Sequence, residues 1–337
     1  MAENVIVILA VGVKLTLETR SMHMAKKKGP SQTTESAPPT KRACGTVHHH
    51  QFLLETVPSF RDNLVKLEHA CQARLTSAAV ARVQTYKINV VVHVVYDPNS
   101  PAQKISEAQV KSQIAVLNRD FRATNPDKSK TPSVFSGLVA EPMIEFVLAT
   151  KDPSGRPTTG ITYTATQQES FDDRGNPVKF KSKGGEDAWN TKKYLNIWVC
   201  KLGNGLLGYA QFPGGPANTD GVVILNTAFG NNGTAAAPYN LGRSATHEIG
   251  HFLNLHHIWG DLPNCTGNDL VTDTPGSESP NFGKPAFPHI SCHNGPHGDM
   301  YINYMDYVDD DSMFMFTPGQ VSRMHTTLDG PRSALVN

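Results

Sequence analysis

Histidine and glutamate side chains able to bind a metal and activate water are concentrated between His247 and His257, in the sequence H-E-I-G-H-F-L-N-L-H-H. His247 and His251 are four residues apart, so on a helix both imidazoles lie on one face and can bind a single Zn²⁺. Glu248 follows the first histidine, where its carboxylate can reach a water molecule on the metal. The spacing therefore predicts one catalytic zinc ion with Glu248 as the general base.

The third zinc ligand must come from beyond this helix. His257 lies six residues after His251, so a continuous helix would carry it too far along the axis to share the metal. We expect the helix to end near Asn254 and the chain to turn back there, because Asn follows Gly in tolerating left-handed backbone conformation. His256 is the spare histidine and should be exposed or lie behind the ligands. An isolated H-E-x-x-H can occur by chance, but so many histidines in one segment favour a metal site.

The extended motif resembles the metzincin signature, H-E-x-x-H-x-x-G-x-x-H followed by a turn that contains methionine. The candidate turn is N-Y-M-D-Y at residues 303–307, with Met305 at its centre. Together with D-T-P at residues 273–275, these motifs resemble the pappalysin family, and most closely its secreted microbial members. The resemblance runs from about residue 88 to residue 320. Asn254 stands where the family usually has glycine.

The resemblance implies an α+β fold. A twisted mixed sheet, a backing helix and the active-site helix would form an upper subdomain, above an irregular lower subdomain with the Met-turn and a C-terminal helix. The implied activity is that of a zinc endopeptidase acting on proteins or peptides. Met305 would form an apolar floor beneath the histidines. Tyr307 would hydrogen-bond the tetrahedral intermediate of the reaction, although a packed core tyrosine is the alternative interpretation.

The same resemblance implies two features of the loop after the zinc motif. One is a disulfide between Cys265 and Cys292, which would fasten a long irregular segment. The other is a calcium ion bound by Asp269, the carbonyl oxygen of Val271 and Thr274, since Ca²⁺ prefers oxygen ligands. Ordinary turn formation by aspartate is the alternative to calcium. The five cysteines include no C-x-x-C pair, which argues against a structural zinc ribbon.

Two further residues carry functional hypotheses. Asp310 lies five positions after Met305, where a relative that prefers basic residues has an aspartate at the base of its P1′ pocket. We therefore predict a preference for Arg or Lys just after the cleaved bond, with a solvated acidic loop as the alternative. Cys44, in R-A-C-G at residues 42–45, resembles the cysteine of the family's precursors. It could bind the zinc and keep the enzyme latent; a free or disulfide-bonded cysteine is the alternative.

The chain of 337 residues divides into three expected regions. Residues 1–24 are interpreted as a signal peptide or N-terminal extension, because residues 5–13 are apolar although no basic residue precedes them. Residues 25–85 resemble a propeptide, basic and rich in Ser, Thr and Pro at first and then helical in its apolar spacing. Residues 86–337 would form the metalloprotease catalytic domain of a secreted zymogen. The three histidines at 48–50 are interpreted as a solvated loop.

Hydrophobic patterning places the main elements of the catalytic domain. A helix should begin at Ser106, the active-site helix near residues 242–246, and a C-terminal helix at Thr317. Strands are expected at residues 88–96, 144–150, 194–202, 209–212 and 220–229. The segment at 209–212 is expected to be an edge strand that can align an extended peptide by main-chain hydrogen bonds.

Composition excludes several classes of function. Lys and Arg number 31 against 30 Asp and Glu, which argues against a general nucleic-acid binder. No apolar run approaches the 18 residues of a membrane-spanning helix. Two alternatives remain: a catalytically inactive binding module on the same fold, and a metal-binding protein without protease activity. Glu248 beside the histidines favours an enzyme over the first alternative, and the Met-turn and edge strand argue against the second.

Overall fold

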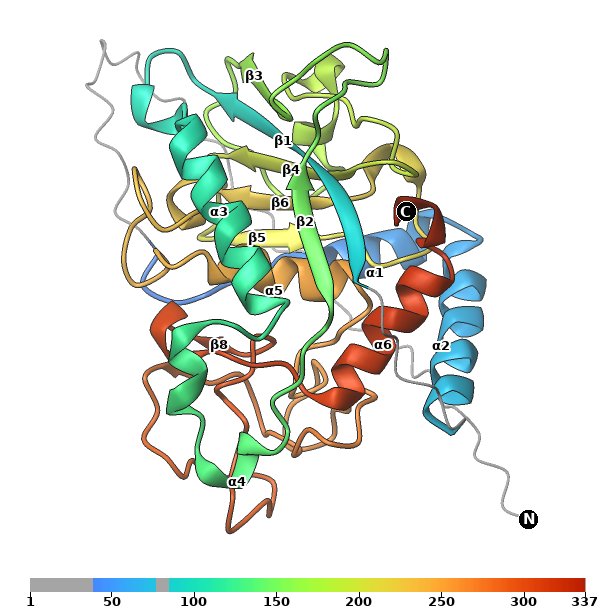
Figure 1. Cartoon of the computed structure of the whole chain (residues 1–337), viewed down its shortest axis with the longest axis vertical. Coiled ribbons are helices and arrows are strands. Elements are labelled where there is room, and N and C mark those ends of the chain that lie inside the picture. Colours follow the sequence, from blue (N-terminus) through green and yellow to red (C-terminus); the bar gives the residue numbers. More distant parts are fainter. Residues whose placement is uncertain (1–38, 77–84, 337) are drawn as a thin grey trace, which may run out of the picture. The chain divides into compact units, whose positions relative to one another are not determined.

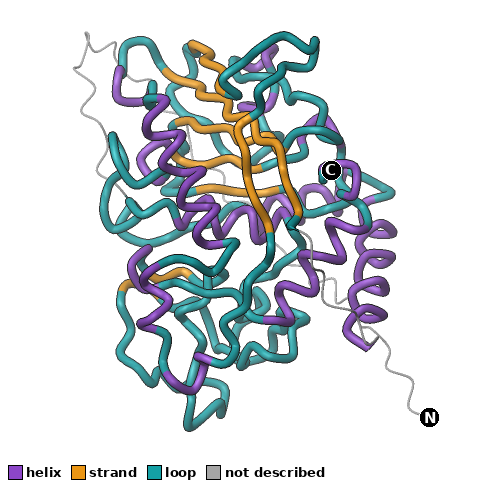
Figure 2. Tube along the Cα trace, viewed as in Figure 1, coloured by secondary structure: helices purple, strands orange, loops and turns teal. Residues whose placement is uncertain are grey.

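The computed structural model describes residues 39–76 and 85–336 (Figures 1 and 2). The hypothesised signal segment at 1–24 therefore lies outside the described residues. The helices are α1 (Thr46–Thr56), α2 (Phe60–Thr76), α3 (Glu107–Asp120), α4 (Ser133–Ser136), α5 (Arg243–Phe252) and α6 (Pro318–Asp329). The strands are β1 (Tyr86–Tyr96), β2 (Ile144–Leu148), β3 (Ile161–Ala165), β4 (Leu195–Cys200), β5 (Gly208–Ala210), β6 (Val222–Leu225), β7 (Phe282–Gly283) and β8 (Tyr307–Val308).

A mixed sheet with the strand order β2-β1-β4-β6-β5 forms the upper part of the fold, and β3 also pairs with β1. The long strand β1 pairs in parallel with β2 along its first half and with β3 along its second half. Its run of valines is buried, as expected of a β-branched strand in a sheet covered on both faces. Strand β5 runs antiparallel to β6 and forms the edge next to α5. The predicted α+β class and twisted mixed sheet are confirmed.

Helices α3 and α5 cover the sheet (Figure 1). Helix α3 begins after Ser106, whose hydroxyl accepts a hydrogen bond from the backbone nitrogen of Gln109. Its apolar side chains recur at helical spacing, and Val110, Leu117 and Phe121 are fully buried. This agrees with the backing helix predicted from the sequence. Helix α5 is buried along its whole length and packs against β5 and β6.

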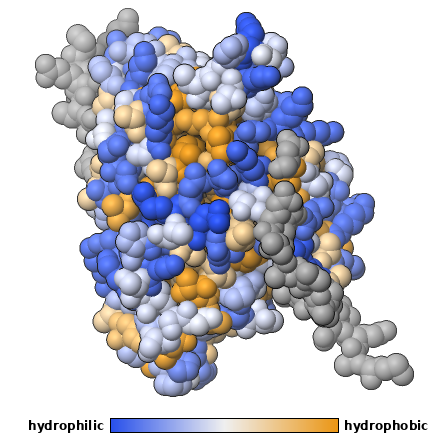
Figure 3. Space-filling view, viewed as in Figure 1, coloured by the Kyte–Doolittle hydropathy of each residue, from blue (hydrophilic) through white to orange (hydrophobic). Residues whose placement is uncertain are grey.

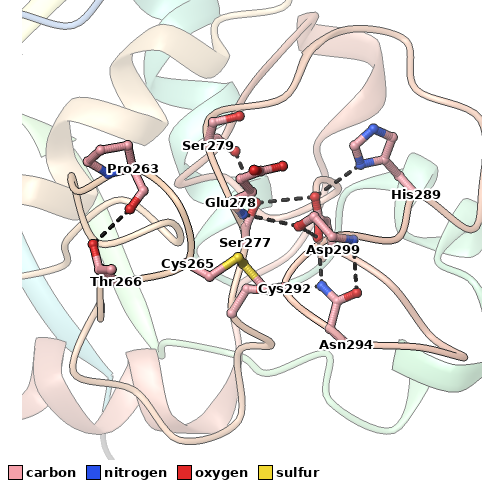
Figure 4. Close-up of a disulfide and its surroundings, with 12 residues drawn as sticks. Pro263, Cys265, Thr266, Ser277, Glu278, Ser279, His289, Cys292, Asn294 and Asp299 are labelled. Atoms are coloured by element: carbon pink, nitrogen blue, oxygen red, sulfur yellow. Dashed lines mark hydrogen bonds and ion pairs between the residues drawn. A yellow bond between two sulfur atoms is a disulfide. The ribbon is translucent and has the colours of Figure 1, made fainter.

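Below the sheet and α5, the chain is mostly loop (Figure 2). The disulfide between Cys265 and Cys292 that the resemblance implied is present in this region (Figure 4). Asp299 beside it is buried and fixes the loop by accepting several hydrogen bonds. Its donors are the side chains of Ser277, Asn281, Ser291 and Asn294, with His289 also in contact. The disulfide and the hydrogen bonds to one buried carboxylate therefore order this irregular region, which lacks the backbone hydrogen bonds of regular helices and sheets.

Helix α6 closes the lower region, as expected from its start signal. Thr317 and Gln320 form a reciprocal capping box, and Pro318 occupies the first turn. Asp273 adds to this cap, because its carboxylate accepts hydrogen bonds from the Thr317 hydroxyl at 2.6 Å and the Gly319 nitrogen at 2.8 Å. The D-T-P segment thus joins the loop after the zinc motif to the last helix.

Several details differ from the sequence-based expectations. The expected helical region before the domain is two helices, because Pro58 cannot continue α1 and disfavours helical backbone at Val57 before it. Strand β3 was not predicted, and the strand expected at 220–229 ends at Leu225. The loop expected at residues 48–50 is wrong, although His48 is solvated as expected, with its side chain 85% exposed. These histidines lie in α1, and the His49 side chain is buried against β5.

The molecular face in Figure 3 alternates hydrophilic areas with smaller hydrophobic ones. Among the described residues, no helix combines the length and the apolar character needed to cross a bilayer.

Candidate metal centre and cleft

Three buried histidines meet at one point. The Nε2 atoms of His247 and His251 are 3.2 Å apart, and the Nε2 atom of His257 lies 3.3 Å and 3.0 Å from them. The first two share one face of α5. The chain then reverses at Asn254, whose φ of 71° lies in the left-handed region, and brings His257 back. The structure thus places together the three residues that the sequence proposed as ligands.

The second nitrogen of each of these rings has its own partner. The Nδ1 atoms of His247 and His251 lie 2.7 Å from carbonyl oxygens of Tyr304 and Leu255, and that of His257 contacts the Asp261 carboxylate. Because these oxygens only accept hydrogen bonds, Nδ1 carries the proton and the three Nε2 lone pairs face one another. Burial lowers the pKa values of His247 and His251 well below normal, which favours this neutral form.

Lone pairs so close together repel unless a cation lies between them. Two nitrogens bound to zinc at 2.0–2.1 Å in a tetrahedral arrangement are separated by roughly 3.3 Å, and the observed separations of 3.0–3.3 Å are close to this value. The Cys44 sulfur completes a group whose four ligand atoms lie within 4.8 Å of one another. The donor set therefore fits Zn²⁺, with three imidazoles and a thiol at the fourth position.

Glu248 lies in the same cluster and is almost completely buried. Its Oε2 atom accepts a hydrogen bond of 2.8 Å from the Thr46 hydroxyl and lies 3.4 Å from the Cys44 sulfur. Burial raises the pKa of Glu248 to about 7. Strand β5 passes so close that a Cβ atom at Gly208 would lie 2.8 Å from the Glu248 side chain. Glycine at this position therefore lets the edge strand approach the carboxylate.

Residues 43–46 lie along β5 like an additional strand. The Gly45 nitrogen donates to the Gly208 oxygen at 2.9 Å, the Leu207 nitrogen donates to the Ala43 oxygen at 2.9 Å, and the pairing is parallel. The Ala210 nitrogen donates to the Thr46 hydroxyl at 2.8 Å. The edge strand, placed at residues 208–210, thus holds an extended piece of the chain across the histidines.

Arg42 fills a buried pocket beside this cluster. Its guanidinium pairs with Asp310 at 2.6 Å and donates to the Ser244 hydroxyl at 3.1 Å and the Val308 carbonyl at 3.3 Å. The ring of Tyr239 lies 4.9 Å from the guanidinium carbon. The pocket therefore contacts all three nitrogens of the guanidinium group and one face of its plane.

Asp310 is the base of this pocket and is fully buried, so the alternative of a solvated loop is excluded for this residue. Its second oxygen accepts hydrogen bonds from the backbone nitrogens of Leu241 and Arg243, at 2.8 Å and 3.2 Å. The carboxylate is thus held at the beginning of α5, where the helix dipole favours negative charge.

Met305 and Tyr307 lie next to α5 and the histidines of the cluster. Met305 is buried beneath α5, with its sulfur against Gly250. The Tyr307 ring centroid is 5.7 Å from that of His247 and 4.9 Å from that of His257. Tyr307 therefore borders the cluster and is partly exposed, rather than belonging to the distant core.

The three residues expected to bind calcium also lie together. The Thr274 hydroxyl contacts the Asp269 carboxylate at 2.7 Å and the Val271 carbonyl at 3.0 Å. Burial raises the pKa of Asp269 to about 7. Because these oxygens have hydrogen-bond partners from within the same turn, calcium binding stays a prediction.

Helix α2 contacts the turn that positions His257. The Arg323 side chain is fully buried and donates to the Asn254 carbonyl at 3.1 Å and to that of Leu270 at 3.4 Å. The same guanidinium makes a bidentate ion pair with Glu68 of α2, at 3.0 Å and 2.9 Å. The N-terminal region therefore supports the metal-binding turn as well as covering the cleft.

Sequence reasoning missed several residues of this site. Thr46 and Tyr239 belong to no motif, and Ser244 carries no signal beyond its place in the active-site helix. Arg42 was visible only as part of R-A-C-G. Asp261 lies four residues after His257, a spacing that could have indicated a partner for its ring.

Known proteins resemble both the sequence and this geometry. The pattern of the peptidase M43 family, described as pregnancy-associated plasma protein-A, matches residues 180–329. An extracellular metalloprotease of Arthroderma gypseum is 31% identical over 296 residues, which cover 86% of this chain and 84% of the relative.

Solved structures agree with these matches. A promirolysin mutant of Tannerella forsythia is 46% identical, with a TM-score of 0.81, covering 87% of this chain and 97% of that one. Mature mirolysin from the same organism, in complex with a cleaved peptide, is 51% identical with a TM-score of 0.74, covering 75% and 96%. The chain is therefore a metalloendopeptidase and belongs to the pappalysin family, peptidase M43.

Proposed function

We propose that this chain is a secreted zinc endopeptidase made as a latent precursor, with zinc held by His247, His251 and His257. The observation that carries the proposal is the convergence of three unprotonated Nε2 atoms beside Glu248, at the edge strand of the sheet. Relatives named extracellular metalloproteases support secretion.

The side chains around the centre have separate roles in the proposed reaction. Zinc would supply a Lewis acid that polarises the scissile carbonyl and acidifies water. Glu248 would take a proton from the attacking water and return it to the leaving amine. Strand β5 would align the substrate main chain, as it now aligns residues 43–45. The Tyr307 hydroxyl would hydrogen-bond the developing oxyanion.

Residues 42–46 support latency at three points of the cleft. The Cys44 thiol lies at the fourth position of the histidine cluster. The Thr46 hydroxyl engages the Glu248 carboxylate, so the proposed base is blocked separately from the metal. Arg42 fills the Asp310 pocket. A substrate could enter only after this segment leaves.

The Asp310 pocket supports a preference for arginine at P1′. Arg42 uses a different nitrogen for each of Asp310, Ser244 and Val308. Lysine has a single ammonium group and no planar face for Tyr239, so it could satisfy fewer of these contacts. We therefore propose that peptides with arginine at P1′ are cleaved faster than peptides with lysine there.

Replacing Asp310 with asparagine should lower kcat/KM for peptides with arginine at P1′ by about ten- to a hundredfold. The reason is the loss of a buried, charge-assisted hydrogen bond, which contributes about 1.5–3 kcal/mol. Cleavage rates of matched peptides with P1′ arginine or norleucine would measure the change. Asp311→Asn is the control, because this neighbouring carboxylate is half-exposed and pairs with Lys284 outside the pocket. An unchanged arginine preference in Asp310→Asn would contradict the assignment.

Zinc binding tests the proposed centre directly. We expect one zinc ion per chain by elemental analysis and loss of stoichiometric zinc in His257→Ala. Asp261→Ala removes the acceptor that orients the His257 ring, so zinc affinity should fall about 10- to 100-fold in competition with a chelator. Asp152→Ala, in a surface turn closed by Arg156, is the control. Full zinc affinity in both His257→Ala and Asp261→Ala would refute the centre.

A further inference from the structure

A second cation lies next to the arginine pocket. Lys41 precedes Arg42 in the chain, and its ammonium nitrogen is 5.2 Å from the centroid of the Phe282 ring. This distance is typical of a cation–π contact. Phe282 is 40% exposed, which is unusually high for a large apolar residue, so its ring is accessible from solvent. Consecutive side chains of the N-terminal segment therefore occupy two adjoining sites.

The Phe282 ring is attached firmly to the wall of the arginine pocket. Strand β7 pairs with β8, so Phe282 lies opposite Tyr307, with ring centroids 5.9 Å apart. Val308 of β8 provides the carbonyl that Arg42 contacts, and the Asp309 nitrogen donates to the Gly283 oxygen at 2.9 Å. The ring therefore has a fixed position relative to the Asp310 pocket.

The charges around this ring also favour a cation. Asp309 and Asp311 follow β8, and only Asp311 is paired, with Lys284. Within the described residues the Asp309 carboxylate makes neither a hydrogen bond nor an ion pair that would neutralise it. A positive side chain over Phe282 thus meets an aromatic face next to a net negative loop.

We propose that Phe282 is the floor of a second substrate subsite, which selects a cationic side chain at P2′. The inference rests on the proposed function, because it uses residues 41–44 as a surrogate for substrate. Cys44 lies at the histidine cluster, Arg42 fills the P1′ pocket, and Lys41 lies one residue further from the cluster. Residues 43–45 run parallel to β5, so a substrate that runs in the opposite direction with arginine in the same pocket would place its next residue, P2′, toward Phe282. The preferred substrates are then proteins with two consecutive basic residues after the cleaved bond.

Peptide cleavage by the full chain after proteolytic activation tests this subsite. Three quenched fluorescent peptides would share arginine at P1′ and differ at P2′, with lysine, arginine or the neutral isostere norleucine. At an exposed site the cation–π contact should raise kcat/KM for lysine and arginine about two- to fivefold over norleucine. The variants are Phe282→Leu, which removes the aromatic face, and Phe282→Tyr, which keeps it. Zinc content and melting temperature serve as folding controls.

The inference expects Phe282→Leu to lose the P2′ preference and Phe282→Tyr to keep it. Equal cleavage of the three peptides by the parent, or an undiminished cation preference in Phe282→Leu, would overturn it. A set with P1′ norleucine separates this result from the proposed function. Arginine preference at P1′ with a flat P2′ profile rejects only the Phe282 subsite, whereas absence of both preferences, or of all cleavage, rejects the pocket assignment and the subsite together.

Discussion

Glu248→Gln should lower kcat/KM for a peptide substrate by about 10²- to 10⁴-fold while zinc content stays at one ion per chain. The expected loss is that of a positioned general base. Glutamine matches glutamate in size and can still accept the Thr46 hydrogen bond seen at 2.8 Å. It cannot take a proton at neutral pH, so the variant separates proton transfer from the fold and from metal binding.

The matched control is Glu107→Gln on α3, an exposed glutamate paired with Lys111 four residues later. It should cleave like the parent, because surface ion pairs of this kind contribute little. Both variants would be assayed after activation, with zinc measured on the same samples. Glu248→Gln that cleaves as fast as the parent would exclude Glu248 as the base.

Acidification should weaken the hold of the N-terminal segment by up to about a thousandfold between pH 7 and pH 5. The groups responsible are His49 and His50 of α1. His49 is 1% exposed and neither of its ring nitrogens has a hydrogen-bond partner. His50 packs between the rings of Phe60 and Phe212, at 5.4 Å and 5.0 Å. Both rings are thus held in surroundings that disfavour a positive charge.

The pKa values give the sign of this effect. Burial, assisted by the Lys179 ammonium, lowers the pKa of His49 to about 3, and burial lowers that of His50 to about 4. A released segment would titrate near 6.5. Below pH 6.5 the released form therefore binds protons that the docked form rejects, and each histidine favours release about tenfold per pH unit. At pH 5 this amounts to about 30-fold for each. Above pH 6.5 the two histidines have no such effect.

Hydrogen exchange of the α1 amides measures docking without requiring activity. The comparison uses Cys44→Ala, which removes the proposed thiol ligand, with and without His49→Gln and His50→Gln. All other side chains are the same in both proteins, so the difference in their pH dependence isolates the two histidines of α1. Protection should fall about a thousandfold in Cys44→Ala and within about tenfold in the triple variant. The same pH dependence in both proteins would contradict the assignment to His49 and His50.

The zinc cluster was predictable because its determinants are local. The four-residue spacing and the turn at Asn254 define where two imidazoles lie and where the helix must end, and φ at Asn254 is indeed left-handed. The pocket around Asp310 was reachable only through the family resemblance. Its partner Arg42 is 268 residues away in sequence, and no periodicity connects the two.

Other parts of the structure depend on contacts that no local pattern carries. Three consecutive histidines look solvated in sequence, yet His49 is buried because the segment before it pairs with β5. Thr46 reaches Glu248 across 202 residues. Strand β3 has only five residues, of which Ile161 alone is buried, and it is stabilised as a strand by the second half of β1. Such features follow from tertiary packing rather than from intrinsic propensity.

The pair between Glu68 and Arg323 has a consequence for biogenesis. If the N-terminal region departs as proposed, the guanidinium loses its carboxylate but keeps the carbonyls of Asn254 and Leu270. The removable helix thus neutralises the cation that anchors the metal-binding turn while the chain is being made. The N-terminal region would thus assist folding from within the same chain, and the mature protease would keep a native structure that the precursor reaches more readily. Once denatured, the trimmed form should return to its native state more slowly than the precursor.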